Sequence, residues 1–326
     1  MKFAIIGCGL IGQKRLRAIR KKHSVVIAAD LSLARAEALA GMVEGVVATS
    51  DWARAVAHRD VDAVVVATTN DSLAPIAKAA LEAGKHVIVE KPGARSSLEL
   101  SLVIQAARTA GKRVQVGFNH RYHPAFRKAR EIVDSGALGP LMFARARYGH
   151  GGRVGYDREW RADPAIAGGG ELIDQGVHLI DLARWFLGDF VKVEGHAQTC
   201  YWDMPVDDNA FLLLRTAQDQ TAFLHVSCTE WKNLFSFELY GRNGKLHVEG
   251  LGGSYGVERL SFYRMLPQMG PPETTIWEYP GEDRSWDLEL ADFEAAILDP
   301  AAPLAGLDDA RAALDVVREI YEKSTK

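Results

Sequence analysis

The sequence is short of several features that would assign it to a specialised class of protein. It has 3 cysteines in 326 residues (Cys8, Cys200 and Cys228), too widely spaced for a disulfide framework or a cysteine metal site. So few cysteines fit a reducing compartment, and we expect a cytoplasmic protein. The 39 basic and 42 acidic residues leave a net charge of −3, which argues against a nucleic-acid partner. No apolar run approaches the ~20 residues of a membrane span, so no membrane association is expected.

The first part of the chain, up to about residue 120, alternates short apolar runs with alanine-rich helical segments. The runs are rich in β-branched residues, as strands covered on both faces are. Strand and helix in regular alternation predict a doubly wound parallel sheet of the Rossmann type. The expected strands are 2–7, 24–30, 45–50, 62–68, 86–90 and 113–119, and the expected helices are 10–22, 33–40, 51–57, 73–83 and 97–110.

The pattern changes after about residue 120. Four or five longer strands between 191 and 250, joined by tight turns, predict a mostly antiparallel sheet. We therefore expect two domains, a Rossmann domain at 1–120 and an α+β domain with a large, open, mostly antiparallel sheet at 121–326. The other elements expected in the second domain are helices at 124–135, 285–298 and 307–322, a helix that follows the three glycines of 168–170 and is closed by Gly188, and a strand at 140–149.

The segment "FAIIGCGLIGQKRL" carries Gly7, Gly9 and Gly12 in G-x-G-x-x-G spacing between a strand and a helix. Glycines in this context allow backbone N–H groups to approach a pyrophosphate at the helix N-terminus. Asp30 ends the next strand, where it would accept hydrogen bonds from the adenosine ribose and repel a 2′-phosphate. We expect NAD, with NADP as the alternative cofactor and a tight turn without ligand as the alternative explanation. Leu10 and Ile11, inside the motif, are included among the expected cofactor contacts.

The segment "AGKHVIVEKPGA" places Glu90, Lys91 and Pro92 at the carboxyl end of the fifth strand. Ligands of open parallel sheets bind beyond these strand ends, so all three residues are expected near the cofactor. A lysine there can also hydrogen-bond a substrate oxygen and stabilise negative charge as it develops. A solvated lysine that simply ends a strand is the alternative.

The segment "GGGELIDQGVHLIDLARWFLG" (168–188) carries Asp174, His178 and Asp181 at i, i+4 and i+7, on one face of a helix. This face is either the solvated side of an amphipathic helix or the wall of a reaction site. His178 suits a general base, and Asp174 could orient its ring or hold a substrate hydroxyl. We expect Asp181 to be structural, paired with Arg184. Without an evident third ligand, no metal is expected.

Together with "ATTNDSLAPIAKAALEAGKHVIVEKP" (67–92) and "VGFNHRYHPAF" (116–126), these segments resemble the glucose–fructose oxidoreductase, inositol dehydrogenase and rhizopine catabolism (Gfo/Idh/MocA) family. The resemblance implies hydride transfer between a nicotinamide and a secondary hydroxyl or ketone of a sugar, sugar acid or inositol. It implies Lys91, Asp174 and His178 as the catalytic set and Pro92 in a cis peptide. It also implies a homodimer or homotetramer formed through the second sheet.

The chain departs from the family after the fourth strand. Members often have a histidine after a "TPN" turn, whereas this chain reads Thr68-Thr69-Asn70-Asp71-Ser72-Leu73. Of these residues, Thr68 and Asn70 are retained as expected cofactor neighbours.

The segment "RARYGHGGRVGYDREWR" (145–161) is dense in arginine and aromatic residues, which suit polyol hydroxyls, sugar rings and anionic groups. An ordinary exposed loop is the alternative. The arginines also motivate a nucleotide-linked sugar as an alternative substrate, and a non-catalytic NAD(P)-binding regulator is the alternative of another class. The expected substrate contacts are Lys91, Asn119, Arg121, Tyr148, Arg153, Tyr156, Trp160, Asp174 and His178.

Overall fold

A computed structural model describes residues 1–324, which divide into two compact units. The first unit contains Met1–Phe118, Ala165–Gly168 and Trp286–Arg311, and the second contains the remaining residues. This division differs from a single cut at residue 120, because α9 (Ser285–Leu298) packs in the core of the first unit. Trp286 and Phe293 of α9 join the apolar cluster that contains Phe3.

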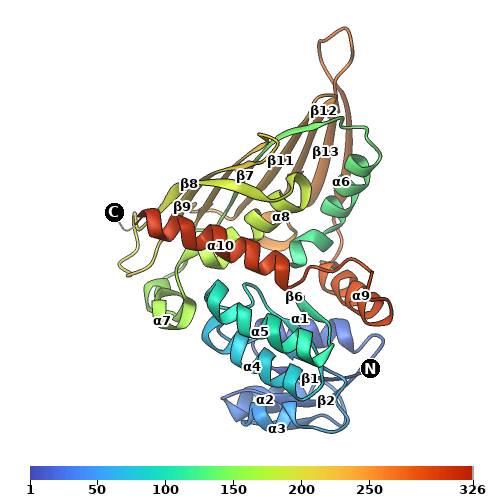
Figure 1. The fold of residues 1–326 in the computed structure, drawn as a ribbon, viewed down its shortest axis with the longest axis vertical. Coiled ribbons are helices and arrows are strands. Elements are labelled where there is room, and N and C mark those ends of the chain that lie inside the picture. The colour runs from blue at the N-terminus through green and yellow to red at the C-terminus, as the bar shows by residue number, and fades with distance from the viewer. Residues whose placement is uncertain (325–326) are drawn as a thin grey trace. The chain divides into compact units, whose positions relative to one another are not determined.

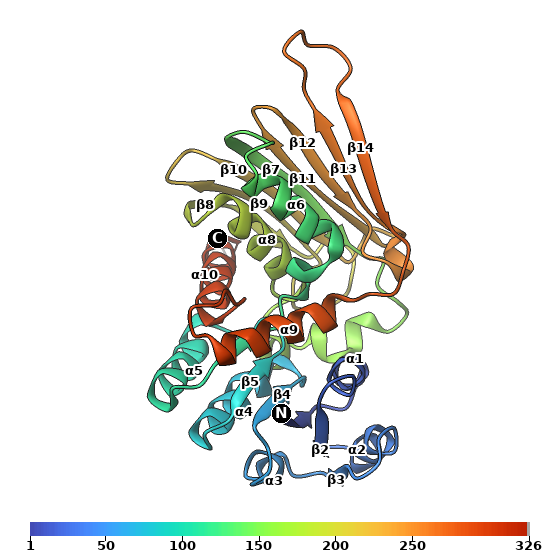
Figure 2. The same cartoon turned by 90° about the vertical axis from the view of Figure 1, so that its right-hand side faces the viewer.

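The first unit is built on a six-stranded sheet in the order β3-β2-β1-β4-β5-β6. Every neighbouring pair is parallel, and the central strands are almost wholly buried, so the predicted doubly wound sheet is confirmed (Figure 2). The strands are β1 (Lys2–Ile6), β2 (Ser24–Ala29), β3 (Val47–Thr49), β4 (Ala63–Val66), β5 (His86–Val89) and β6 (Val114–Val116).

Capping hydrogen bonds and local backbone conformation set where the helices between these strands begin and end. The Asp51 carboxylate accepts hydrogen bonds from the amides of Ala53 and Arg54 at the start of α3, and Ser96 accepts one from Glu99 in α5. Gly111 ends α5 in the left-handed conformation that glycine adopts readily. The helices are α1 (Leu10–Ile19), α2 (Leu33–Ala40), α3 (Trp52–Val56), α4 (Asn70–Glu82) and α5 (Ser97–Ala110).

The second unit is built on an eight-stranded sheet in the order β14-β13-β12-β11-β7-β10-β9-β8. All neighbours are antiparallel except β10 and β7, which confirms the mostly antiparallel sheet. Its last two strands, beyond residue 250, were not anticipated. The strands are β7 (Leu141–Gly149), β8 (Phe190–Gln198), β9 (Asn209–Thr216), β10 (Thr221–Ser227), β11 (Leu234–Gly241), β12 (Gly244–Glu249), β13 (Glu258–Arg264) and β14 (Glu273–Tyr279).

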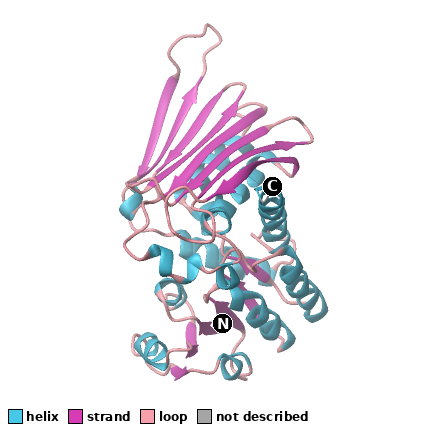
Figure 3. Ribbon diagram, turned by 90° about the vertical axis from the view of Figure 1, so that its left-hand side faces the viewer, coloured by secondary structure: helices cyan, strands magenta, loops and turns pink. Residues whose placement is uncertain are grey.

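The two faces of this second sheet have different surroundings. Helices α6 (Pro124–Asp134) and α8 (Val177–Leu187) pack on one face (Figure 1), where residues such as Ala146, Leu212 and Leu224 are buried. Figure 3 views the opposite face, on which Leu213 and Phe223 are exposed. The strands therefore alternate between buried and accessible side chains.

Shorter helical segments connect these elements, and α10 ends the described chain. No helix among residues 1–324 is both long enough and apolar enough to cross a membrane. The remaining helical segments are η1 (Asn119–Tyr122), η2 (Tyr156–Arg158), η3 (Trp160–Ala162), α7 (Pro164–Ala167), η4 (Leu172–Gly176), η5 (Gly253–Tyr255) and α10 (Leu307–Ser324).

Candidate active site

In the glycine turn between β1 and α1, close packing leaves no room for a side chain at two of the three glycines but does leave room at the third. A Cβ atom on Gly7, whose φ is +93°, would lie 2.2 Å from the carbonyl oxygen of Ala67. A Cβ on Gly12 would lie 2.0 Å from the carbonyl oxygen of Gly7. A Cβ on Gly9 would meet no atom within 4 Å. Gly7 and Gly12 therefore close the turn, whereas Gly9 leaves open space above it.

The start of α1 fits a bound dinucleotide. Gly9 is its N-cap without a side-chain hydrogen bond, and the first turn holds no acidic residue, so no side-chain oxygen caps its amides. Such amides are suited to a pyrophosphate. The Asp30 carboxylate is held in place by the amides of Cys8 and Ser32, each at 2.9 Å.

The apolar side chains at this end of the sheet add to the fit. Leu10 is 70% exposed and Leu31, next to Asp30, is 90% exposed. Such exposed leucines can cover an adenine ring. Ile11, by contrast, packs partly against the apolar core of the first unit.

The residues expected at the ends of β4 and β5 lie in the same unit as this turn. The peptide bond between Lys91 and Pro92 is cis, as the family resemblance implied. The Thr68 hydroxyl donates to the carbonyl oxygen of Thr69 at 3.2 Å. The buried Asn70 amide donates to the carbonyl oxygen of Ala167 at 2.9 Å, so Asn70 is engaged within the protein.

Glu90 belongs to a buried ionic cluster that the sequence did not reveal. Arg15 of α1 donates to Glu90 Oε1 from Nε at 2.8 Å and from Nη2 at 2.6 Å, and it donates from Nη1 to Glu289 of α9. The guanidinium also lies over the ring of Trp286, 4.6 Å from its centroid. Burial raises the pKa of Glu289 to about 7 despite the opposing effect of Arg15. The cluster fixes the residue that precedes Lys91.

The turn before the predicted catalytic helix is filled by the protein's own side chains. A Cβ on Gly169 would lie 2.2 Å from the Tyr321 hydroxyl, and a Cβ on Gly170 would lie 2.0 Å from the carbonyl oxygen of Asp207. The Asp207 carboxylate accepts hydrogen bonds from the amides of Gly170 and Leu172 at 2.9 and 2.8 Å. Burial raises the pKa of Asp207. A buried carboxylate thus caps this helix.

The helix itself is not regular over its whole length. It begins as a π-helical turn, η4, that contains Asp174, and continues as α8 with His178 and Asp181. The helix expected between the three glycines and Gly188 is therefore present, but its first turn is π-helical and wider, which shifts the spacing of Asp174 relative to His178 and Asp181. Single π turns are frequent at functional sites.

All three polar residues of this helix are buried, which excludes the solvated-face explanation. Asp174 is 8% exposed, His178 4% and Asp181 1%. Asp174 accepts a hydrogen bond from Arg161 Nε at 2.9 Å. Burial disfavours the charged guanidinium of Arg161, but Asp174, together with Tyr156 and Glu159, outweighs this effect and raises the Arg161 pKa.

The expected partner of Asp181 was wrong. Asp181 accepts hydrogen bonds from Arg121 Nε and Nη2, at 2.7 and 2.5 Å, whereas Arg184 pairs with Asp189 at 2.6 Å. Arg121, expected to contact substrate, is therefore held in a buried ion pair. The two residues are 60 positions apart in sequence, so helical spacing could not reveal the pair.

His178 lies against an aromatic cluster. Its ring stacks on that of His120 with centroids 3.8 Å apart and planes at 22°. The ring of Tyr148 lies 5.3 Å from His120, and burial raises the pKa of Tyr148 well above its usual range. Asn119 donates to the Ser285 hydroxyl at 3.1 Å. His120 was missed, although it stands within the same "NHRY" segment as Asn119.

The residues of the 150–161 loop that were predicted to contact substrate lie in different environments from one another. Arg153 is 65% exposed in its side chain and pairs with Glu159 at 2.6 Å. Tyr156 is buried, with its ring 5.4 Å from that of His150. Trp160 lies under the Arg161 guanidinium, 4.5 Å from the ring centroid. The structure therefore links Trp160 through Arg161 to Asp174, whereas Arg153 lies on the surface.

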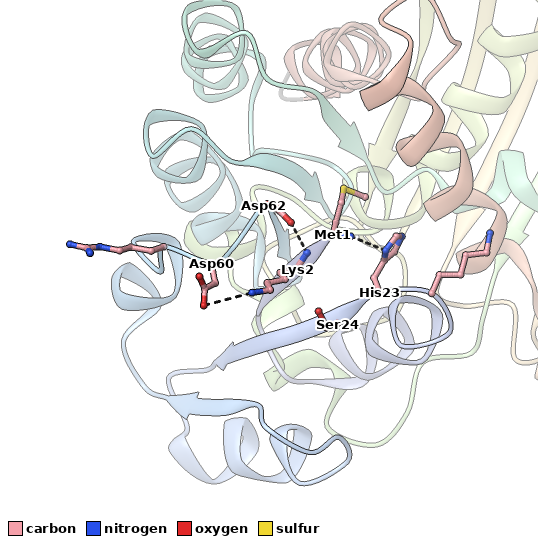
Figure 4. Close-up of a pocket in the computed structure, with 8 residues that line it drawn as sticks. Met1, Lys2, His23, Ser24, Asp60 and Asp62 are labelled. Atoms are coloured by element: carbon pink, nitrogen blue, oxygen red, sulfur yellow. Dashed lines mark hydrogen bonds and ion pairs between the residues drawn. The ribbon is translucent and has the colours of Figure 1, made fainter.

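A further hollow of about 680 Å³ lies elsewhere in the first unit, lined in part by Lys2, His23 and Asp62 (Figure 4). It lies at the amino ends of β1 and β2, whereas the glycine turn follows the carboxyl end of β1, so it is separate from the candidate cofactor site. At this hollow, the amino group of Met1 lies 3.1 Å from His23 Nδ1, and the Lys2 amide donates to Asp62 at 2.7 Å. Among residues 1–324, no group of three or more histidine, cysteine or acidic residues is arranged to hold a metal ion.

Comparison with known proteins matches both parts of the chain to one family. Residues 1–118 match the model described as an oxidoreductase family with an NAD-binding Rossmann fold, and residues 126–247 match the GFO/IDH/MocA C-terminal domain. The chain is 30% identical over 233 residues to levoglucosan dehydrogenase from Pseudarthrobacter phenanthrenivorans, covering 61% of this chain and 58% of that protein. It is 32% identical over 223 residues to inositol 2-dehydrogenase 2 from Saccharopolyspora erythraea, covering 66% and 63%.

These aligned segments span about three fifths of the length of the two relatives. A structural match extends further. Levoglucosan dehydrogenase in complex with NADH and levoglucosan superposes with a TM-score of 0.86 at 25% identity, covering 99% of this chain and 97% of that one.

Proposed function

The chain belongs to the Gfo/Idh/MocA oxidoreductase family and carries its NAD-binding Rossmann domain, and from this premise we propose that it is an NAD-dependent dehydrogenase acting on a secondary hydroxyl of a sugar or polyol. The first unit would bind the cofactor, and the second would supply the residues that hold the substrate. The relatives named for levoglucosan and inositol support this class of substrate.

One observation carries the proposal: Asp174 and His178 are buried side chains with specific partners on a helix that begins with a π turn. Burying an imidazole or a carboxylate is costly unless the group has hydrogen-bonding or charged partners. Here Asp174 is fixed by Arg161, and the His178 ring is fixed by stacking on His120. Such fixed groups are suited to proton transfer.

In the proposed reaction, bound NAD supplies the hydride acceptor. His178 takes the proton of the substrate hydroxyl, and the Lys91 ammonium hydrogen-bonds the same oxygen and stabilises its negative charge as the carbonyl forms. Asp174 holds a neighbouring substrate hydroxyl. Arg161 orients Asp174 by donating a hydrogen bond to its carboxylate at 2.9 Å. In the opposite direction His178 returns the proton to the oxygen.

Substitution of the two residues that act on the substrate oxygen tests this assignment. We expect Lys91→Ala and His178→Ala each to lower kcat by roughly 10²- to 10⁴-fold with the sugar or polyol that gives the highest wild-type turnover, measured at the nicotinamide absorbance. Lys78→Ala, on the exposed surface of α4, is the matched control and should keep wild-type turnover. Full turnover in both active-site variants would refute the catalytic assignment. NADH binding without turnover of any sugar or polyol would instead favour a regulator.

We also propose that the chain forms a homodimer or homotetramer through the open face of its second sheet. On that face Phe143, Leu213 and Phe223 are 38%, 40% and 45% exposed on neighbouring strands. Contiguous exposed apolar side chains are typical of an interface. Phe223→Asp should therefore lower the sedimentation coefficient toward that of a monomer. A wild-type monomer at micromolar concentration would refute this proposal.

The cytoplasm is the proposed location. Its support is the exposed Cys200, a free thiol that fits a reducing compartment, together with the unpaired Cys8 and Cys228.

A further inference from the structure

Three aromatic side chains beside the 150–161 loop have no part in the proposed reaction. Trp231 is 65% exposed and Tyr201 is 61% exposed, and their rings lie 4.7 Å apart at 85°. The ring of Trp202 lies 5.3 Å from that of Tyr201. We call these three residues the aromatic shelf. Large aromatic side chains left accessible together are characteristic of binding surfaces.

The aromatic shelf is continuous with the 150–161 loop. A Cβ on Gly151 would lie 3.1 Å from Trp231 Cα, and a Cβ on Gly152 would lie 2.4 Å from the ring of Trp202. The two glycines therefore let the loop lie directly on the shelf. Tyr156, further along the loop, has its ring 5.7 Å from that of Trp202.

Hydrogen bonds to buried groups hold part of the aromatic shelf in place. The buried Asp208 carboxylate accepts hydrogen bonds from the amides of Cys200, Tyr201 and Trp202 at 2.7, 2.7 and 2.9 Å. The Trp202 indole N–H donates to the carbonyl oxygen of Cys228 at 3.0 Å. Rigid aromatic side chains lose little conformational entropy when they bind a ligand.

Trp231 is held in a conformation that a non-glycine residue rarely adopts. Its φ is +56°, in the left-handed region. The amide of the preceding Glu230 donates to the carbonyl oxygen of His150 at 3.0 Å, which anchors the turn to the loop. Strained backbone that directs a large apolar side chain into solvent is more often found at functional positions than elsewhere.

The 150–161 loop contacts both the shelf and Asp174. From the shelf, Tyr156 follows Trp202, and Arg161 connects the same loop to Asp174 at 2.9 Å. Burial raises the pKa of Tyr156, and the negative charges of Glu171 and Asp174 add to the effect. A substrate held at Asp174 could therefore extend over the loop toward the shelf.

The charges of the loop indicate what kind of group would lie there. Each of its three arginines has a carboxylate partner: Arg153 with Glu159 at 2.6 Å, Arg158 with Asp157 at 3.9 Å, and Arg161 with Asp174 at 2.9 Å. These pairs leave the loop no arginine without an acidic partner to receive a diphosphate. This balance favours an uncharged group over the nucleotide of a nucleotide-linked sugar.

We propose that the aromatic shelf binds a second, uncharged sugar ring, so that the substrate is a disaccharide or another glycoside whose oxidised ring lies at Asp174 and His178. The C–H face of a sugar ring is apolar and packs flat on an aromatic ring, while its hydroxyls remain at the edge, where the polar groups of the loop can reach them. The inference deepens the proposed function and rests on it.

Kinetics on matched substrates test the proposal. Maltose, cellobiose and lactose would each be compared with glucose or galactose for wild type, Trp231→Ala, Tyr201→Ala and the control Trp277→Ala, a half-buried tryptophan on β14. For the best disaccharide, we expect wild-type kcat/KM to exceed that of its monosaccharide by roughly tenfold or more. Each shelf substitution should bring that ratio close to one, and Trp277→Ala should leave it at the wild-type value.

A second measurement separates this proposal from the proposed function. Intrinsic tryptophan fluorescence, titrated with the same disaccharides in the absence of cofactor, should show saturable quenching that Trp231→Ala removes. Quenching without turnover of any sugar would support the shelf and refute the dehydrogenase. Turnover of monosaccharides with equal kcat/KM for disaccharides, or a preference for UDP-glucose over every disaccharide, would refute the shelf and leave the dehydrogenase standing.

Discussion

Two glycine-rich turns open two helices in this protein, and they solve the same electrostatic problem in opposite ways. The amides at a helix start attract negative charge. At α1 the turn leaves space above Gly9 and offers no side-chain acceptor, so the anion must come from a ligand. Before α8 the Asp207 carboxylate occupies the corresponding position, so the anion is part of the protein. A glycine cluster before a helix therefore indicates that another group comes close to the backbone. It does not indicate whether that group is a ligand or part of the protein.

The largest effect that distinguishes the two turns should come from adding one methyl group to each. Gly170→Ala would place Cβ 2.0 Å from the backbone oxygen of Asp207, and that contact can be relieved only if backbone moves. We expect a loss of about 3 kcal/mol in the free energy of unfolding, measured by denaturant titration of the full chain. Gly9→Ala meets no atom within 4 Å and should change the same free energy by less than ~1 kcal/mol. Equal losses in both variants would contradict the comparison.

Removing the internal anion should have the next largest effect. Asp207→Ala removes the acceptor of the buried Leu172 amide and leaves the Gly170 amide with the Tyr321 hydroxyl alone, and we expect about 2 kcal/mol of destabilisation. Asp207→Asn retains one acceptor oxygen and should lose less. Thermal unfolding of both variants beside wild type measures the difference. The interpretation fails if Asn destabilises the chain as much as Ala does.

The ligand-binding turn should respond in affinity rather than in stability. Gly9→Ala fills space that we assign to the cofactor pyrophosphate, so the Kd for NADH should rise by roughly tenfold or more. Titration of NADH fluorescence measures this affinity, and the unfolding curve of the same variant is its control. Unchanged NADH affinity in a stably folded Gly9→Ala variant would show that the open space is not used.

The last expected effect is a pH dependence from the buried cluster behind Lys91. The pKa of Glu289 is raised from 4.5 to about 7, so between these values the folded chain keeps a proton that the unfolded chain has lost. The free energy of unfolding should therefore fall as pH rises through this window, and Glu289→Gln should lessen that fall. Denaturant titrations at pH 5, 6 and 7 test this, with the exposed Glu282→Gln as control. Identical pH slopes for wild type and Glu289→Gln would disprove the shifted pKa.

Local patterns in the sequence predicted much of the first unit, because strand, turn and helix there follow one another within a few residues. The second sheet was harder to predict. β13 and β14 were both missed. For β14 the reason is that it is an edge strand whose residues Glu273–Ile276 are all exposed, so its sequence lacks the alternation of a half-buried strand. The partners of Asp181 and Arg15 were also missed, since they lie 60 and 274 positions away along the chain.

By itself, the sequence determined the glycine turn, the parallel sheet and the residue types available for proton transfer, because each depends on spacing over one or two neighbouring elements. Only the tertiary structure decided that the helix face with Asp174 and His178 is buried. It alone also decided that Arg121 pairs with Asp181 and that Asp207 caps the helix. Burial and ion pairing are set by which distant segments come together to exclude water, and no local spacing encodes that choice.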